Sequence, residues 1–79
     1  IDTAKDTPQH FAILRTNRGL AYRASGDGDR ALADFDEAIR LDPLYADARS
    51  ARGALHLARG ELKAALGDFE EALGLEPEH

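Results

Sequence analysis

The sequence predicts an all-α fold of two consecutive helix-turn-helix units, and two observations support this prediction. First, seven landmark residues recur after thirty-four residues. They are Gly19, Tyr22, Gly26, Ala31, Phe35, Ala38 and Pro43, which return as Gly53, His56, Gly60, Ala65, Phe69, Ala72 and Pro77. A period of this length is typical of repeat architectures. Second, the apolar residues late in each unit are spaced as on one helix face. We therefore expect four antiparallel helices.

The first helix is predicted to run from about residue 8 to residue 25. Thr7 precedes Pro8, and a threonine hydroxyl can accept hydrogen bonds from the free N–H groups of a first helical turn. Proline suits the first helical position because its missing donor would be unpaired there anyway. Gly26 can close the helix in the left-handed conformation. Residues 1–6 are polar and aperiodic, so we expect a frayed lead-in.

The second helix is predicted over residues 29–41, with Asp27 or Asp29 as its cap. A calcium loop starting at Asp27 is the alternative. It would need an oxygen ligand at Ala31, glycine at Leu32 and glutamate at Ala38, and it therefore fails.

Asp42 and Pro43 repeat the capping pattern and predict a third helix from residue 44 or 45 to about residue 59. Gly60 and Glu61 form the next turn, although glutamate caps less well than aspartate. The fourth helix is predicted over residues 62–75, before Pro77.

The chain resembles the tetratricopeptide repeat family. Ala31-x3-Phe35 and Ala65-x3-Phe69, followed by Pro43 and Pro77, match the family pattern in both copies. Gly19-x2-Tyr22 also matches, whereas the second copy has His56, and arginines stand at the usual tryptophan and leucine positions. The resemblance implies a short right-handed α-solenoid with a lead-in at 1–11, repeat 1 at 12–45 and repeat 2 at 46–79. It also implies a protein interaction scaffold that binds a protein or peptide and has no catalysis of its own.

Composition excludes several other functions. The net charge of −5 argues against nucleic acid as a partner, because phosphate binding needs clustered lysine and arginine. The absence of cysteine excludes disulfides and thiolate metal sites. No apolar run is long enough for membrane insertion. Because the chain begins at Ile1 rather than methionine, we expect a processed or excised piece, either cytoplasmic or exported after signal removal.

No catalytic constellation is visible, so we predict no enzyme activity, no cofactor and no metal site. His10, His56 and His79 are widely separated and lack paired ligand spacing. His56 replaces Tyr22 of the first copy, and we interpret it as a half-buried ring with one hydrogen-bond partner.

Two exchanges between the copies predict conserved core volume. Leu14 corresponds to Ala48, and Ala21 corresponds to Leu55, so a large and a small residue exchange places on one helix face. We interpret the exchange as compensation inside a packed layer.

Repeated charges predict two structural ion pairs. Arg18 and Arg52 each precede a packing glycine, and Asp34 and Asp68 each precede the core phenylalanine. We expect each arginine to lay its stem over apolar neighbours and to pair with an aspartate across helices. The alternative is a stripe that receives an acidic peptide and is formed by Arg15, Arg18, Arg49 and Arg52.

The first helix of each unit has one face on which the copies differ, and this face is the candidate peptide groove. It comprises Ile13, Thr16, Asn17, Leu20 and Arg23 in the first copy and Asp47, Ser50, Ala54 and Leu57 in the second. The resemblance implies that this face lines a concave groove for an extended peptide or a partner helix. The alternative is ordinary surface.

The last helix lacks a following element within the sequence, and solenoid units normally bury their faces against neighbours. Leu66, Phe69 and Leu73 are therefore the candidate self-association face. Three hypotheses follow: a fragment of a peptide-binding adaptor, a self-assembling module that homodimerises through its uncapped helical faces, or a regulatory appendage of an enzyme elsewhere in a longer polypeptide.

Overall fold

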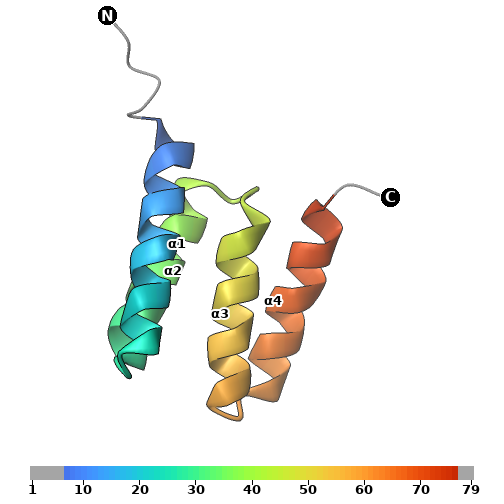
Figure 1. Cartoon of the computed structure of the whole chain (residues 1–79). Helices are drawn as coiled ribbons and strands as arrows, with labels where there is room; N and C mark the ends of the chain where they lie inside the picture. Colours follow the sequence, from blue (N-terminus) through green and yellow to red (C-terminus); the bar gives the residue numbers. More distant parts are fainter. Residues whose placement is uncertain (1–6, 77–79) are drawn as a thin grey trace, which may run out of the picture.

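The computed structural model describes residues 7–76 and forms four helices in the predicted order. They are α1 (Pro8–Ala24), α2 (Gly28–Leu41), α3 (Ala46–Ala58) and α4 (Leu62–Leu75). Successive helices run in opposite directions, and the described residues contain no strand (Figure 1). The predicted all-α fold is confirmed. Residues 1–6 and 77–79, and with them most of the expected lead-in and Pro77, lie outside the described residues.

The helix ends follow the predicted capping residues to within one or two positions. The hydroxyl of Thr7 accepts a hydrogen bond from the backbone N–H of His10, at 3.3 Å. Asp27 rather than Asp29 caps α2, because its Oδ1 accepts from the backbone N–H of Arg30, at 3.1 Å. Gly26 and Gly60 have φ angles of 89° and 76°, the left-handed conformation that glycine adopts without strain.

The start of α3 differs from the prediction. The Oδ1 atom of Asp42 accepts from the N–H of Leu44, at 3.1 Å, and so stabilises a turn instead of a helix cap. The helix begins after this turn, at Ala46, and Tyr45 in the N-cap position offers no side-chain hydrogen bond. Glu61 likewise makes no side-chain cap to α4.

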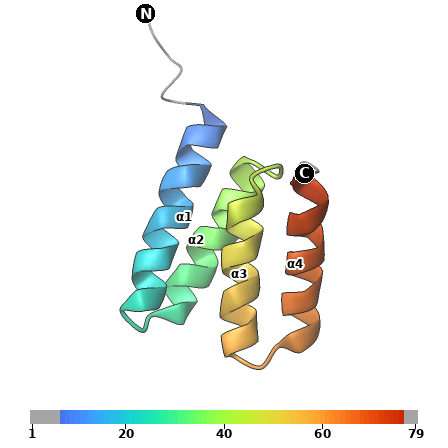
Figure 2. The same ribbon diagram turned by 45° about the vertical axis from the view of Figure 1, so that its right-hand side comes forward.

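The helices pack in chain order as two hairpins that meet between α2 and α3, and α1 also contacts α3 (Figure 2). The core follows this order. Phe35 of α2 is fully buried and packs with Ala31 of the same helix and with Ala51 and Leu55 of α3. A second cluster joins Ala12, Ala38 and Ala48, and small residues there let three helices approach closely.

The interpretation of the Leu14 and Ala21 exchange as core compensation is wrong. Ala48 and Leu55 are buried between the hairpins. Leu14 is 49% exposed and Ala21 is exposed, because α1 has no helix on its outer side among the described residues. The two exchanges therefore record different surroundings, a buried interface for α3 and an open end for α1.

Candidate functional site

A hollow of about 350 Å³ lies between α1 and α3, on the face predicted as the peptide groove. Thr16, Asn17 and Leu20 line it from α1, and Tyr45, Asp47, Ser50 and Ala51 line it from the start of α3. The two helices contact each other directly, so the hollow lies over their junction. Its exposed lining is mostly apolar, with a few polar groups at its edge.

Five of the nine candidate groove residues line this hollow, but Thr16 lies in its floor. Its side chain is 2% exposed, and its hydroxyl donates to the backbone carbonyl of Ala12 at 2.9 Å. This geometry leaves Asn17, Leu20, Asp47 and Ser50 as the accessible side chains.

The other four candidate residues lie outside the lining of the hollow. Ile13 and Leu57 are 41% and 53% exposed, Arg23 is exposed, and Ala54 is half-buried. They belong to the same two helices, so they can contact only a ligand that extends beyond the hollow.

Tyr45 lines the hollow and was missed in the sequence because the predicted helix start placed it inside the first turn of α3. Burial raises the pKa of its phenol, and the nearby Asp47 carboxylate raises this pKa further because a phenolate would be repelled by it. The Tyr45 ring also packs against the cluster of Ala12, Ala38 and Ala48.

Both predicted ion pairs are present between the helices of each hairpin. Arg18 donates from Nε and Nη2 to the two carboxylate oxygens of Asp34, each at 2.8 Å. Arg52 donates to Asp68 in the same way, at 2.8 and 2.7 Å. Asp34 and Asp68 are 3% and 6% exposed, so these two-point hydrogen bonds satisfy carboxylates that would otherwise be buried without partners.

Arg52 makes one further contact, which crosses from one hairpin to the other. Its Nη1 donates to Asp36 of α2 at 2.9 Å. A second cross-hairpin ion pair joins Arg59 Nη2 and Asp29 Oδ1 at 2.8 Å. The interface between α2 and α3 therefore combines an apolar centre with charged pairs at its edge.

The alternative of an arginine stripe for acidic peptides is not favoured by these contacts. Arg18 and Arg52 are held by aspartates, and Arg49 donates to the backbone carbonyl of Pro43. Arg15 lies 4.0 Å from Asp34. Each guanidinium is therefore already close to an acceptor within the fold.

His56 fits the interpretation of a packed ring with a hydrogen-bond partner. Its side chain is 17% exposed, and its Nδ1 lies 2.7 Å from Oε1 of Glu61. Within residues 7–76, no group of three or more histidine, cysteine or acidic side chains is arranged to hold a metal ion.

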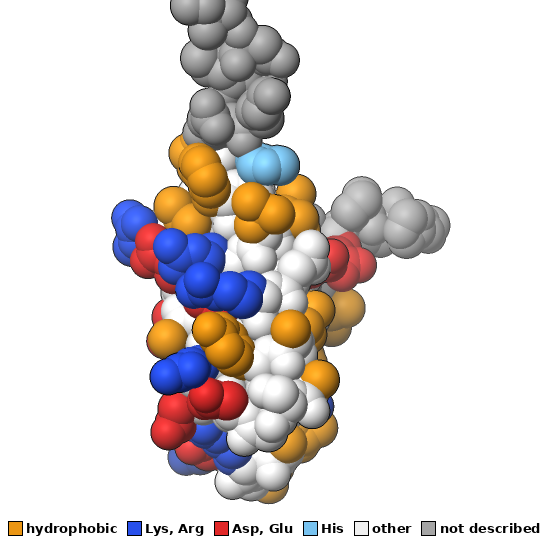
Figure 3. Space-filling model, turned by 60° about the vertical axis from the view of Figure 1, so that its left-hand side comes forward, with side chains coloured by type: hydrophobic (Ala, Val, Ile, Leu, Met, Phe, Trp, Pro, Cys, Tyr) orange, Lys and Arg blue, Asp and Glu red, His pale blue; other side chains and the backbone are white. Residues whose placement is uncertain are grey.

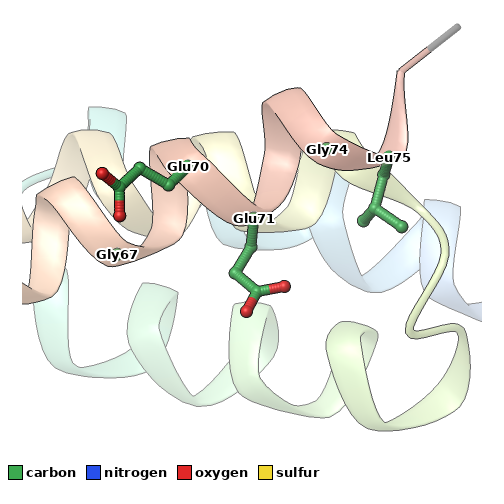
Figure 4. A pocket seen from close by; sticks show the side chains of 5 residues that line it. All are labelled: Gly67, Glu70, Glu71, Gly74 and Leu75. Atoms are coloured by element: carbon green, nitrogen blue, oxygen red, sulfur yellow. The ribbon is translucent and has the colours of Figure 1, made fainter.

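The candidate self-association face is open at two of its three residues. Leu66 and Leu73 are 58% and 73% exposed, whereas Phe69 is half-buried because its ring packs against Gly53 of α3. A further hollow on α4 is lined by Gly67, Glu70, Glu71, Gly74 and Leu75. Figure 4 shows Glu70 and Glu71 projecting from α4 to different sides. The outer surface of α4 thus combines apolar and acidic groups.

No helix within residues 7–76 has the length and apolar character that crossing a membrane requires. Comparison with curated proteins yields no match. The family model described as tetratricopeptide repeat matches residues 16–79, which is most of the chain and includes all of α2, α3 and α4. The matched range also contains the packing glycines that lie against phenylalanine and the left-handed glycines of the two turns. The chain therefore belongs to the tetratricopeptide repeat family.

Proposed function

We propose that the chain is a non-catalytic interaction module that binds a peptide or a partner helix in the groove between α1 and α3. The family is generally a protein–protein interaction module. The observation that carries the proposal is the hollow itself, because five residues predicted from the sequence line it together with Tyr45. The two repeats are proposed to span residues 12–45 and 46–79.

The lining of the hollow restricts the chemistry of the ligand. Leu20 and the Tyr45 ring offer apolar contact, while Asn17 and Ser50 can each donate and accept hydrogen bonds. Asp47 is exposed at the edge and can accept only, so it favours a lysine or arginine side chain or an N–H group. The proposed ligand is a short segment that combines one apolar side chain with a nearby cationic one.

Selection from a library of random peptides displayed on phage tests this proposal. The wild-type chain should enrich peptides of that composition, and Ser50→Arg should abolish the enrichment because the new side chain fills the hollow. Ala33→Arg is the matched control, since Ala33 is exposed on α2 and lies outside the lining. Equal enrichment by Ser50→Arg and Ala33→Arg would refute groove binding.

A second candidate function is self-association through the open face of α4. The specific observation is the contrast between the two hairpins. Leu32 and Ile39 of α2 pack against the core clusters next to α3, whereas the corresponding Leu66 and Leu73 of α4 are mostly exposed. A homodimer would cover these side chains, and exposed apolar surface of this kind commonly marks an interaction site.

A further inference from the structure

We propose that copies of this chain stack head to tail, with α1 of one copy docked on α4 of the next in the way that α3 docks on α2. This inference rests on the self-association candidate and specifies its geometry. It does not depend on the groove, which lies between α1 and α3 of a single copy. The interface between α2 and α3 has a counterpart at each end of the described fold, on the uncovered sides of α1 and α4.

The thirty-four-residue repeat assigns a counterpart to each side chain of the inner interface. On the α2 side, Leu32, Phe35 and Ile39 correspond to Leu66, Phe69 and Leu73 of α4. Phe35 is 0% exposed and its counterpart Phe69 is half-buried. Leu32 and Ile39 are half-buried, whereas their counterparts Leu66 and Leu73 are 58% and 73% exposed. The end of the molecule at α4 therefore has the apolar surface that α3 covers on α2.

The other end of the molecule carries the counterpart of the docking face of α3. Tyr45 and Ala48 pack in the inner interface and correspond to Phe11 and Leu14 of α1. Phe11 and Leu14 are 42% and 49% exposed. Figure 3 views this end of the molecule and shows hydrophobic side chains next to a group of basic side chains. The α1 end can thus supply an apolar face to an α4 end.

The ion pair between Arg52 and Asp36 joins the two hairpins inside the molecule. Its counterparts at the two ends of the molecule are Arg18 and Glu70. Arg52 uses Nε and Nη2 for Asp68 and its Nη1 for Asp36 across the interface. Arg18 uses the same two nitrogens for Asp34, and its Nη1 makes no hydrogen bond among residues 7–76, although the guanidinium lies over the Tyr22 ring, 5.7 Å from its centroid. Stacking in the inner register places this nitrogen opposite Glu70, the counterpart of Asp36, which makes no ion pair within the described range.

Net charge on the two end helices is also complementary. Helix α1 contains three arginines and no acidic residue, whereas α4 contains three acidic residues and one lysine. Opposite charge on the two ends speeds their encounter and disfavours pairing of like ends. This observation favours α1 against α4 over a two-fold dimer of α4 against α4. The ion pair between Arg59 and Asp29 would not be reproduced in the stack, because the corresponding residues at the two ends are Ser25 and Lys63.

A head-to-tail contact uses two different surfaces, so it does not close after two copies. The assembly is expected to lengthen as the protein concentration rises, without a preferred dimer. Docking of separate copies also costs the translational and rotational entropy that the covalent link between α2 and α3 removes. The stack should therefore dissociate on dilution even though the inner interface stays intact.

Two blocked variants test the proposal by sedimentation velocity. Leu14→Glu blocks the α1 end, and Leu73→Glu blocks the α4 end, while both positions are exposed enough to keep the fold. The wild-type chain should show a mass that increases with concentration. Each variant alone should remain monomeric over the same concentrations, because its self-association is at least about tenfold weaker than that of the wild type. An equimolar mixture of the two should form a dimer and nothing larger, because one free α1 end meets one free α4 end.

Leu44→Glu is the matched control, since Leu44 is 74% exposed in the turn before α3 and belongs to neither end face. It should stack like the wild-type chain, and circular dichroism should show equal helicity for all variants. A wild-type chain that stays monomeric, a Leu14→Glu variant that still self-associates, or a mixture that remains monomeric would each overturn the proposal. Peptide selection by the groove is a separate readout, so its failure does not affect this test.

Discussion

Substitution of the two packing glycines by alanine should have unequal effects on stability. A Cβ atom at Gly19 would lie 2.5 Å from Cε1 of Phe35, and one at Gly53 would lie 2.9 Å from Cε1 of Phe69. Phe35 is fully buried under α3, whereas Phe69 is half-buried at an open end and can shift outward. Alanine in a helix gains about 0.5–1 kcal/mol over glycine. Overpacking a closed core costs about 1–3 kcal/mol.

At Gly19 the cost of overpacking should exceed the gain in helix propensity. Gly19→Ala is therefore expected to lower the free energy of unfolding by about 1–2 kcal/mol. Such a loss lowers the melting temperature by roughly 4–8 °C for each kcal/mol in a domain of this size. Gly53→Ala should stay within about 0.5 kcal/mol of the wild type.

Gly67→Ala is the control for helix propensity alone, because a Cβ atom added there would meet no side chain and no other helix within 4 Å. It should raise stability by about 0.5–1 kcal/mol. Urea unfolding at low protein concentration, followed by circular dichroism, measures all three variants. A Gly19→Ala variant as stable as the wild type, or a Gly53→Ala variant that loses as much as Gly19→Ala, would refute the reasoning about covered and uncovered phenylalanines.

Three further predictions concern charges and caps, and thermal unfolding followed by circular dichroism measures each. Asp68→Asn should cost about 2 kcal/mol of stability, because it weakens two charge-assisted hydrogen bonds to a buried carboxylate. Asp36→Asn should cost less than about 1 kcal/mol, because the Asp36 side chain is exposed. Equal losses would contradict the assigned burial. Because the pKa of Tyr45 is raised in the folded state, its contribution to stability should be present below pH about 10 and should decrease as the pH rises through the higher folded pKa. Tyr45→Phe should remove that alkaline loss, and a loss of the same size in this variant would count against the assignment. Asp27→Ala should cost about 1 kcal/mol by removing the cap of α2, and an unchanged melting temperature would show that the cap contributes nothing.

The positions of the helices could be predicted from the sequence because short-range chemistry determines them. Thr7 and Asp27 hydrogen-bond to N–H groups three residues later, and Gly26 and Gly60 adopt the left-handed conformation where each helix ends. The start of α3 could not be predicted correctly, because Asp42 can either cap a helix or close a turn. The sequence does not distinguish these two local hydrogen bonds.

The helix face that lines the hollow could be predicted in outline, since comparing the two copies at the thirty-four-residue period identifies the face on which they differ. The depth of each side chain could not be predicted in the same way. Thr16 lies on the predicted face, but its hydroxyl returns to the carbonyl of Ala12 and its side chain is buried. Tyr45 contributes to the hollow from a position before the helix, where helical periodicity carries no information.

The position of α1 at one end of the described fold explains why interpreting the exchanges between the two copies as core compensation is wrong. The exchange of Leu14 and Ala21 against Ala48 and Leu55 looks like compensation if both helices share the same surroundings. They do not, because α3 packs against α1, α2 and α4, whereas no helix within residues 7–76 covers the outer side of α1. Repeat position therefore predicts which way a side chain points, and only the assembled fold determines what covers it.

The most direct test of the proposed groove is chemical-shift mapping by NMR on the isotope-labelled Leu73→Glu variant, titrated with a peptide selected on the wild-type chain. The α4 end is blocked in this variant, so stacking cannot contribute to the shifts. The largest chemical-shift changes are expected at Asn17, Leu20 and Ser50, with small changes on α2 and α4. Changes concentrated on α2 or α4, with those three residues unaffected, would contradict the claim that the groove between α1 and α3 is the binding surface.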